Sequence, residues 1–220
     1  PDGGVRKLGI PTVVDRVIQQ GIAQKLQNIW EPLFSDSSYG YRPRRSGQQA
    51  IQKVKEYAEE GYRYAVSVDL SKYFDTLNHE LLMNLLHRKI QDMRVLRIIK
   101  KYLKSGVMEN GVVSKTEEGS PQGGPLSPLL ANIYLNEFDW EMCGRGVKMV
   151  RYADDIVVFA KSKRAAERLM ESSRRYLEGK LKLKMNTEKS KVTSIFAVKE
   201  FKFLGFCIGR NGSGIYIRAH

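Results

Sequence analysis

The stretch Val147-Lys-Met-Val-Arg-Tyr-Ala-Asp-Asp-Ile-Val-Val-Phe-Ala160 decides how the rest of this 220-residue chain is interpreted. Apolar runs at 147–150 and 156–160 flank two adjacent carboxylates, Asp154 and Asp155. This pattern predicts two strands joined by a tight turn that carries both acids. Two like charges held close together are costly unless a cation neutralises them, and a divalent metal is the simplest candidate. An exposed Asp-Asp turn is a common alternative, so a third acid is needed to decide.

That third acid is Asp69, near the end of Arg63-Tyr-Ala-Val-Ser-Val-Asp-Leu70. In a strand, alternate side chains point to opposite faces. One face of this strand carries large apolar side chains: Tyr64, Val66, Val68 and Leu70. The other face carries Asp69 and two small residues, Ala65 and Ser67. The small face leaves room for a bulky ligand, while the large one packs into a core. Three carboxylates on two neighbouring strands can hold two Mg²⁺ ions, so the sequence predicts phosphoryl-transfer chemistry.

Three segments resemble successive motifs of reverse transcriptases, in the same order and at similar spacing: Asp69-Leu-Ser-Lys-Tyr-Phe74, Gly119-Ser-Pro-Gln-Gly-Gly-Pro-Leu-Ser-Pro128 and Tyr152-Ala-Asp-Asp155. Four further segments extend the resemblance over nearly the whole chain: Arg6-Lys-Leu-Gly-Ile-Pro11, Ser38-Tyr-Gly-Tyr-Arg-Pro43, Asn186-Thr-Glu-Lys189 and Phe203-Leu-Gly-Phe206. The chain is most similar to the group II intron type, a combined reverse transcriptase and splicing maturase. Each segment is a weak to moderate signal alone, and their shared order gives the resemblance its weight.

The resemblance implies an α+β fold: a polymerase right hand with fingers and palm, and a ferredoxin-like antiparallel palm sheet flanked by helices. It assigns residues 1–45 and 77–126 to the fingers, and residues 46–76 and 127–220 to the palm. The thumb or maturase domain expected after the palm in this family has no match in this chain. Because the sequence also begins without Met, it resembles an excised fragment.

The resemblance also implies the site residues and the cofactor. It makes Asp69, Asp154 and Asp155 the catalytic acids, and it adds Leu70 to these three as a metal-binding residue. Two Mg²⁺ ions are the implied cofactor, with Mn²⁺ able to substitute. One ion lowers the pKa of the primer 3′ hydroxyl, and the other binds the triphosphate and steadies the leaving pyrophosphate.

Five further residues are implied to bind substrate. Arg6 is assigned to the triphosphate, and Lys7 either shares that role or is a solvated lysine. Phe74 is assigned to the space beside the nucleotide sugar, with core packing as its alternative. Gln122, in a Gly- and Pro-rich loop, is assigned to the incoming nucleotide or its template base. Lys189 corresponds to a lysine that protonates pyrophosphate, or else it is a loop surface charge.

Composition and charge agree with a nucleic-acid partner. The 37 Lys and Arg residues exceed the 24 Asp and Glu residues, which gives a net charge of +13 and favours a polyanionic ligand. Cys143 and Cys207 stand far apart, so zinc-ligand spacing is missing from the sequence. No apolar run is long enough to span a bilayer. The expected location is therefore the cytoplasm of a bacterial-type cell, with an organellar origin left open.

Periodicity and capping signals predict the main elements. Helices are expected after Thr12, from Ser46 to Gly61, over about 78–89 and 92–104, from Ser127, and over about 162–177. Lys180-Leu-Lys-Leu-Lys-Met185 predicts a half-buried strand with a basic outer face. Residues 201–208 and 215–218 predict a hairpin, which the resemblance identifies as the primer grip. His79 and His87 are expected at the surface or in helix packing.

The predicted function is RNA-directed DNA polymerase, a nucleotidyltransferase of group II intron type that adds dNTPs to a DNA primer on an intron RNA template, with a role in intron splicing and mobility. No membrane partner is expected, and the oligomeric state stays open. Three alternatives remain. An RNA-dependent RNA polymerase is disfavoured because its second Asp is replaced by Phe74. Retron and diversity-generating reverse transcriptases are the nearest enzymes, and a non-enzymatic intron-RNA-binding splicing cofactor would not need all three acids.

Overall fold

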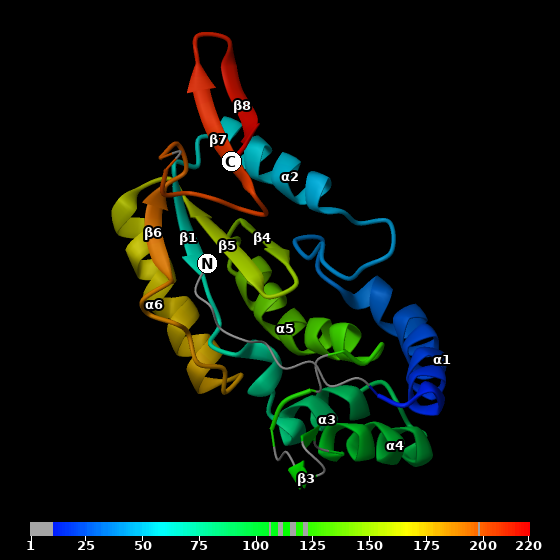
Figure 1. Ribbon diagram of the computed structural model, residues 1–220. Helices are drawn as coiled ribbons and strands as arrows, with labels where there is room; N and C mark the ends of the chain where they lie inside the picture. Colours follow the sequence, from blue (N-terminus) through cyan, green and yellow to red (C-terminus); the bar gives the residue numbers. More distant parts are fainter. Residues whose placement is uncertain (1–10, 106, 110–111, 115–117, 121–122, 198) are drawn as a thin grey trace. The chain divides into compact units, whose positions relative to one another are not determined.

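The computed structural model describes residues 11–105, 107–109, 112–114, 118–120, 123–197 and 199–220 (Figure 1). The chain forms two compact units, each assembled from two segments. Unit 1 comprises Pro1–Leu33 and Lys72–Tyr134, and unit 2 comprises Phe34–Ser71 and Leu135–His220. Within the described residues, no helix combines the length and apolar character needed to cross a membrane.

Unit 1 is mainly helical. Its elements are α1 (Val13–Trp30), η1 (Glu31–Leu33), η2 (Tyr73–Asp75), α3 (His79–His87), α4 (Met93–Lys104), β2 (Val107–Glu109), β3 (Val112–Ser114) and the start of α5 (Ser127–Gly144). The predicted cap is confirmed at α1, where the Thr12 hydroxyl accepts a hydrogen bond from the Asp15 N–H. Asn78 and Asp92 cap α3 and α4 in the same way, which confirms both predicted helices.

The buried face of helix α1 is not the face that carries most of its apolar residues. The residues that it buries are Gln19, Ala23, Leu26 and Trp30. Val14 and Val17 are each 67% exposed, although they lie at helical spacing with Leu26. Burial along α1 is therefore set by tertiary packing rather than by the widest apolar stripe.

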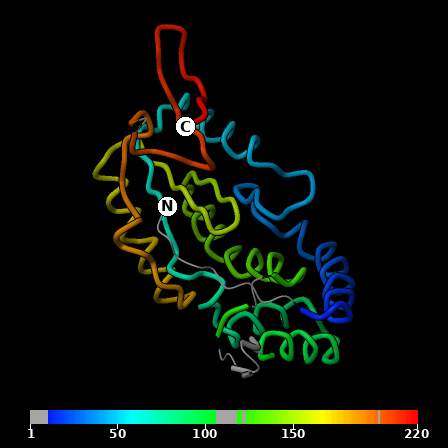
Figure 2. The backbone as a smooth tube through the Cα atoms, in the orientation of Figure 1, coloured from blue at the N-terminus to red at the C-terminus, as the bar shows by residue number. Residues whose placement is uncertain are grey.

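Unit 2 is built around a four-stranded antiparallel sheet in the order β4-β5-β1-β6. The strands are β1 (Tyr64–Val68), β4 (Met149–Tyr152), β5 (Asp155–Ala160) and β6 (Lys191–Ser194). Along the chain they alternate with α5 and α6 (Lys163–Gly179) as β1-α5-β4-β5-α6-β6, which is the ferredoxin-like order. Figure 2 follows the β4–β5 hairpin, coloured yellow-green, from α5 into α6. The predicted α+β fold and its antiparallel sheet are confirmed.

The two faces of this sheet pack against different elements. α6 packs against β1, β5 and β6 (Figure 1). On the other face, α2 (Gly47–Glu59) and the hairpin of β7 (Phe206–Asn211) and β8 (Gly214–Ala219) contribute to a core that contains Ala65 and Phe159. Ala65 is fully buried, so the small face of β1 is core at this end. The same face was expected to admit a ligand. It is accessible only near Ser67 and Asp69, which are partly exposed.

Helix α2 and the C-terminal hairpin confirm their predictions. A full capping box starts α2: the Ser46 side chain accepts from the Gln49 N–H, and the Gln49 side chain accepts from the Ser46 N–H. Gly61, with φ of +88°, follows its end. The hairpin begins at Phe206 rather than Phe201, because Phe203 and Phe206 already close a tight turn through two 2.9 Å backbone hydrogen bonds.

The predicted strand at Lys180–Met185 is wrong. Its leucines are buried and its lysines exposed, as the alternation requires, but Lys182 has φ of +55° and breaks the extended backbone. The Leu183 N–H instead donates to the Leu177 carbonyl at 2.9 Å, and only Met185 forms a bridge, with Leu70. The outer strand beside β1 is β6, which begins at Lys191.

Candidate active site

The turn between β4 and β5 carries the two adjacent acids, as predicted. Tyr152 pairs with Asp155 at the end of the ladder, so Ala153 and Asp154 make the reversal. Ala153 has φ of +58°, a left-handed conformation that is costly for a residue with a Cβ. Such a conformation persists only where the surroundings impose it, so the contacts around this turn decide where the acids lie.

A buried arginine imposes that conformation. Arg151 and Asp139 of α5 both have fully buried side chains, and Arg151 Nε and Nη2 donate to the Asp139 carboxylate at 2.8 and 2.6 Å. Nη1 of the same guanidinium donates to the Ala153 carbonyl at 2.8 Å, and Nη2 also donates to Ser38 Oγ at 2.8 Å. One side chain therefore ties α5, the acid turn and the segment before α2 together.

The segment 37–42 packs directly against the acid turn. The Arg151 N–H donates to the Ser37 carbonyl, and the Tyr39 N–H donates to the Arg151 carbonyl, each at 2.8 Å. A Cβ at Gly40 would overlap the backbone nitrogen of Ala153. A residue without a side chain is thus required at this close approach. The segment Ser38–Pro43 therefore packs beside the turn that carries the acids.

The structure brings Asp69 to the same strand ends as the acid turn. Val68 pairs with Ile156, and Asp69 follows Val68, so it lies beside Asp155 on the adjoining strand. Ser190 Oγ accepts from the Asp69 N–H at 3.0 Å, and the Asn186 N–H donates to the Asp69 carbonyl at 2.9 Å. The backbone of Asp69 is therefore held from both sides.

The charges of Asp154 and Asp69 both act on the neighbouring Asp155 carboxyl group. Although part of Asp155 is exposed, desolvation by the surrounding chain raises the pKa of its carboxyl group, and the charges of Asp154 and then Asp69 raise it further. A cation would relieve this crowding, and carboxylate oxygens are ligands that suit a hard divalent ion. The donor set therefore fits Mg²⁺ or Mn²⁺.

The carboxylates are not yet gathered into a closed set of ligands. Among the described residues, no three or more His, Cys, Asp and Glu side chains are arranged as a ready-made metal-binding group. The Leu70 side chain is buried, so that residue can offer a metal only its backbone carbonyl. Metal binding by Asp69, Leu70, Asp154 and Asp155 stays a prediction.

The sequence analysis missed Tyr41, which lies near the acids. Burial raises the pKa of its phenol, and the charges of Asp154, Tyr152 and Asp155 raise it further. Its backbone is left-handed, with φ of +55°, and its side chain is half-exposed. Its only signal in the sequence is its place in the segment Ser38–Pro43, which resembles a reverse transcriptase motif.

The predicted substrate-binding residues lie in different parts of the chain. Lys189 is exposed in unit 2, in a turn where Asn186 Oδ1 accepts from its N–H at 3.2 Å. Because Asn186 also contacts the Asp69 backbone, this turn is anchored to the site. Phe74 lies in η2 of unit 1, partly buried against Tyr73. Arg6, Lys7 and Gln122 lie outside the described residues.

The described residues near Gln122 in the sequence make specific contacts of their own. The Ser120 N–H donates to the Phe74 carbonyl at 2.6 Å, and Ser120 Oγ donates to Ser127 Oγ at 2.8 Å. His79 is buried with Nε2 2.5 Å from the Gly119 carbonyl, so it packs α3 against that residue. His87 is exposed. Both histidines have the structural roles that were expected.

Comparisons with known proteins show which family this chain is similar to. The family model described as "Reverse transcriptase (RNA-dependent DNA polymerase)" matches residues 1–208. Protein YkfC of Escherichia coli K12 is 36% identical over 250 residues, which cover 96% of this chain and 65% of that protein. Group II intron-encoded protein LtrA of Lactococcus lactis is 31% identical over 280 residues, 98% of this chain and 46% of that protein.

A solved structure shares the fold. Apo telomerase from Candida tropicalis, truncated from its C-terminal domain, has a TM-score of 0.68 at 13% identity, covering 94% of this chain and 45% of that one. This likeness confirms the predicted right-hand polymerase fold, and the intron-encoded relative confirms the predicted resemblance to the group II intron type. The chain spans roughly half to two thirds of the length of these curated relatives.

Proposed function

This chain belongs to the reverse transcriptase (RNA-dependent DNA polymerase) family, and we propose that it is the fingers and palm part of an RNA-directed DNA polymerase of group II intron type. Residues 1–45 and 77–126, which overlap mostly with unit 1, are assigned to the fingers, and residues 46–76 and 127–220, which overlap mostly with unit 2, are assigned to the palm. The observation that carries the proposal is that β1 and the β4–β5 turn, neighbours in the sheet, place Asp69, Asp154 and Asp155 at adjoining strand ends.

The proposed mechanism gives each acid a role toward the primer and the nucleotide. Asp69 and Asp154 are the principal metal ligands, and Asp155 is a further ligand or an electrostatic support. A bound Mg²⁺ pair would supply the positive charge that makes a hydroxyl nucleophilic and stabilises a departing pyrophosphate. The protein contributes position: Arg151 holds the turn, and the Ser190 hydroxyl and the Asn186 N–H hold the Asp69 backbone.

The proposed substrates are a DNA primer, an RNA template and dNTPs. Arg6, Lys7 and Lys189 are assigned to the phosphates, Gln122 to the nucleotide or template base, and Phe74 to exclusion of a ribose 2′ hydroxyl. The net charge of +13 supports a polyanionic template. Similarity to a group II intron-encoded protein supports a role of the whole protein in intron splicing and mobility.

Primer extension on an RNA template tests this proposal. With Mg²⁺ and dNTPs, Asp154→Asn should lower the extension rate by roughly two orders of magnitude or more, because several kcal/mol of charge stabilisation is lost. RNA affinity should stay near that of the unmodified protein, since the basic surface is unchanged. Glu200→Gln, which removes an exposed carboxylate of the same unit, is the matched control and should extend normally.

Two outcomes would count against the proposal. Near-normal extension by Asp154→Asn would remove the acid from catalysis. RNA binding by the unmodified protein without any extension would favour a non-enzymatic splicing cofactor instead.

A further inference from the structure

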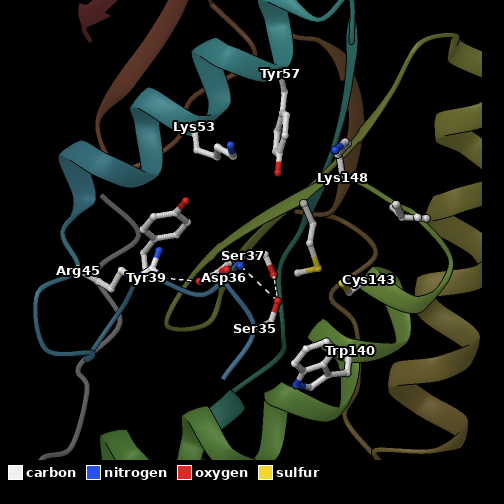
Figure 3. A pocket seen from close by; sticks show the side chains of 13 residues that line it. Ser35, Asp36, Ser37, Tyr39, Arg45, Lys53, Tyr57, Trp140, Cys143 and Lys148 are labelled. Atoms are coloured by element: carbon white, nitrogen blue, oxygen red, sulfur yellow. Dashed lines mark hydrogen bonds and ion pairs between the residues drawn. The ribbon is translucent and has the colours of Figure 1, made fainter. Parts of the chain in front are cut away.

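A second site in unit 2 lies apart from the acids. A cavity of about 590 Å³ is lined by the segment 35–39, α2, the end of α5 and the start of β4 (Figure 3). This volume is within the range of about 300–1,000 Å³ typical of ligand sites. Met149 begins β4 and Lys148 precedes it, at the end remote from the acid turn, and Lys148 is about 13 Å from Tyr152 at ~3.3 Å per residue. Asp69, Asp154 and Asp155 do not line it.

The lining of this cavity, which we call the β4 pocket, carries excess positive charge. Three basic side chains line it against one carboxylate, Asp36. Arg45 is neutralised by Asp36 at 2.5 Å, and Lys53 pairs with Glu56 at 2.7 Å. Lys148 has no carboxylate within ion-pair distance in the described part of the chain. The pocket therefore offers an ammonium group whose charge only a ligand or solvent can balance.

Two of these cations flank one aromatic ring. Lys53 Nζ lies 5.3 Å from the centre of the Tyr57 ring and Lys148 Nζ lies 5.6 Å from it, and Figure 3 shows them on opposite sides of Tyr57. Glu56 offsets the charge of Lys53 only from one side, so an anion placed between the two ammonium groups would be attracted by both of them. This arrangement favours a ligand with a negative group of about the size of a phosphate.

Hydrogen-bond donors face the same space. The hydroxyl groups of Tyr39 and Tyr57 point into the β4 pocket beside Lys53 (Figure 3). Neither hydroxyl is hydrogen-bonded to another atom of the described residues. Burial raises the pKa of both phenols, so both stay protonated at neutral pH and can donate to an anion. Two phenols and two ammonium groups form a donor set suited to phosphate oxygens.

Across the cavity, an exposed indole supplies a different kind of contact. Trp140 of α5 is 51% exposed and lies on the opposite wall from Tyr57 (Figure 3). An exposed tryptophan that faces cationic groups across a cavity is a platform on which a nucleobase can stack. A free phosphate would leave this ring unused, and an acidic peptide has no planar base to stack on it.

We propose that the β4 pocket binds one nucleotide of single-stranded RNA, with its phosphate between Lys53 and Lys148 and its base against Trp140. The inference rests on the proposed function only in choosing RNA as the nucleic acid. It adds a contact at the far end of β4 from the acids, where RNA can be held without entering the catalytic site.

The test compares two paired variants of the full chain. Lys53→Gln combined with Lys148→Gln removes the phosphate contacts, while Lys55→Gln combined with Lys180→Gln removes the same charge outside the pocket. Lys55 is a suitable control because it lies on α2 and pairs with Glu59 at 3.5 Å. The probe is a short fluorescein-labelled oligouridylate, followed by anisotropy at several salt concentrations.

The pocket pair should bind the oligouridylate roughly tenfold more weakly, and its slope of log affinity against log salt should fall by about 0.7 or more. Trp140→Ala should weaken binding roughly tenfold without changing that slope, because stacking releases no counterions. The control pair should stay within about twofold. Thermal melts should show all variants folded.

Cys143 gives a second readout, since it is an exposed free thiol that lines the pocket, whereas Cys207 is buried. Oligouridylate should slow alkylation of Cys143 in the unmodified protein, and oligoglutamate and inorganic phosphate should not. Equal protection by oligoglutamate would overturn the proposal in favour of an acidic peptide. Protection by phosphate, with normal binding by Trp140→Ala, would overturn it in favour of a simple anion site.

Primer extension separates this inference from the proposed function. At saturating RNA, the pocket pair should extend at the normal rate. If the pocket pair extends normally and binds oligouridylate as tightly as the control pair does, RNA binding by the β4 pocket is refuted and the polymerase assignment stands. Pocket-dependent binding by a protein that cannot extend a primer refutes the polymerase assignment and leaves the pocket intact.

Discussion

Replacing Arg151 by methionine should separate the fold of this protein from the placement of its acids. Methionine roughly keeps the volume of the side chain but leaves the fully buried Asp139 carboxylate without its partner. Breaking a buried ion pair from one side costs about 3–5 kcal/mol. For a chain of 220 residues this corresponds to a fall in Tm of roughly 6–20 °C. Arg164→Met, an exposed change on α6, should alter stability by no more than about 0.5 kcal/mol.

The loss of activity should exceed the loss of stability. Arg151 also holds the Ala153 carbonyl, and a shift of about 1 Å in the acids can cost roughly 10²-fold in rate. Adding Asp139→Leu to Arg151→Met removes the stranded charge and should recover at least about 2 kcal/mol, yet leave extension slow because the Ala153 carbonyl is still unheld. Denaturant unfolding and primer extension measure the two effects. Full extension by the double variant would refute the view that Arg151 positions the acids.

Two further predictions concern Asp155 and Phe74. Because desolvation, and then the charges of Asp154 and Asp69, raise the pKa of Asp155, the folded state favours the protonated acid, so metal-free stability should rise as pH falls from neutral through the raised pKa toward 3.8. Asp155→Asn should remove that pH dependence, raise the metal-free Tm at neutral pH by about 1–2 °C and abolish extension; an unchanged or lower Tm would contradict the crowding argument. Phe74→Val should raise rNTP incorporation relative to dNTP incorporation if the ring excludes a 2′ hydroxyl, whereas loss of packing would lower both alike. Matched incorporation assays with a thermal melt distinguish these two results.

Local signals predicted the elements whose boundaries depend on neighbouring residues. The capping box at Ser46 and the left-handed Gly61 bracket α2 because both satisfy backbone groups within a few positions. The hairpin that carries Asp154 follows from two apolar runs of strand length. Such features need no knowledge of distant parts of the chain, and the sequence therefore located them.

Features that depend on contacts between distant parts of the chain could not be predicted from local sequence signals. The alternation in Lys180–Met185 is real, but the left-handed Lys182 and the bond from Leu183 to Leu177 keep that segment out of the sheet. Tyr41 has no chemical signature in the sequence, and its place near Asp154 arises because Gly40 lets the backbone meet the acid turn. In both cases a partner far along the chain determines the outcome.

The link between Arg151 and Asp139 explains why an acid motif alone could not describe this site. In the sequence, Arg151 is one charge in an apolar strand, and strand alternation directs it away from the face that bears Asp155. Its carboxylate partner lies 12 positions earlier, on a helix whose side chains have a different period. Only the packed fold brings the two together, and the same guanidinium then fixes the carbonyl of the left-handed Ala153. Substituting an acid therefore tests the chemistry of the site, whereas substituting Arg151 tests whether the core of unit 2 sets the geometry in which that chemistry takes place.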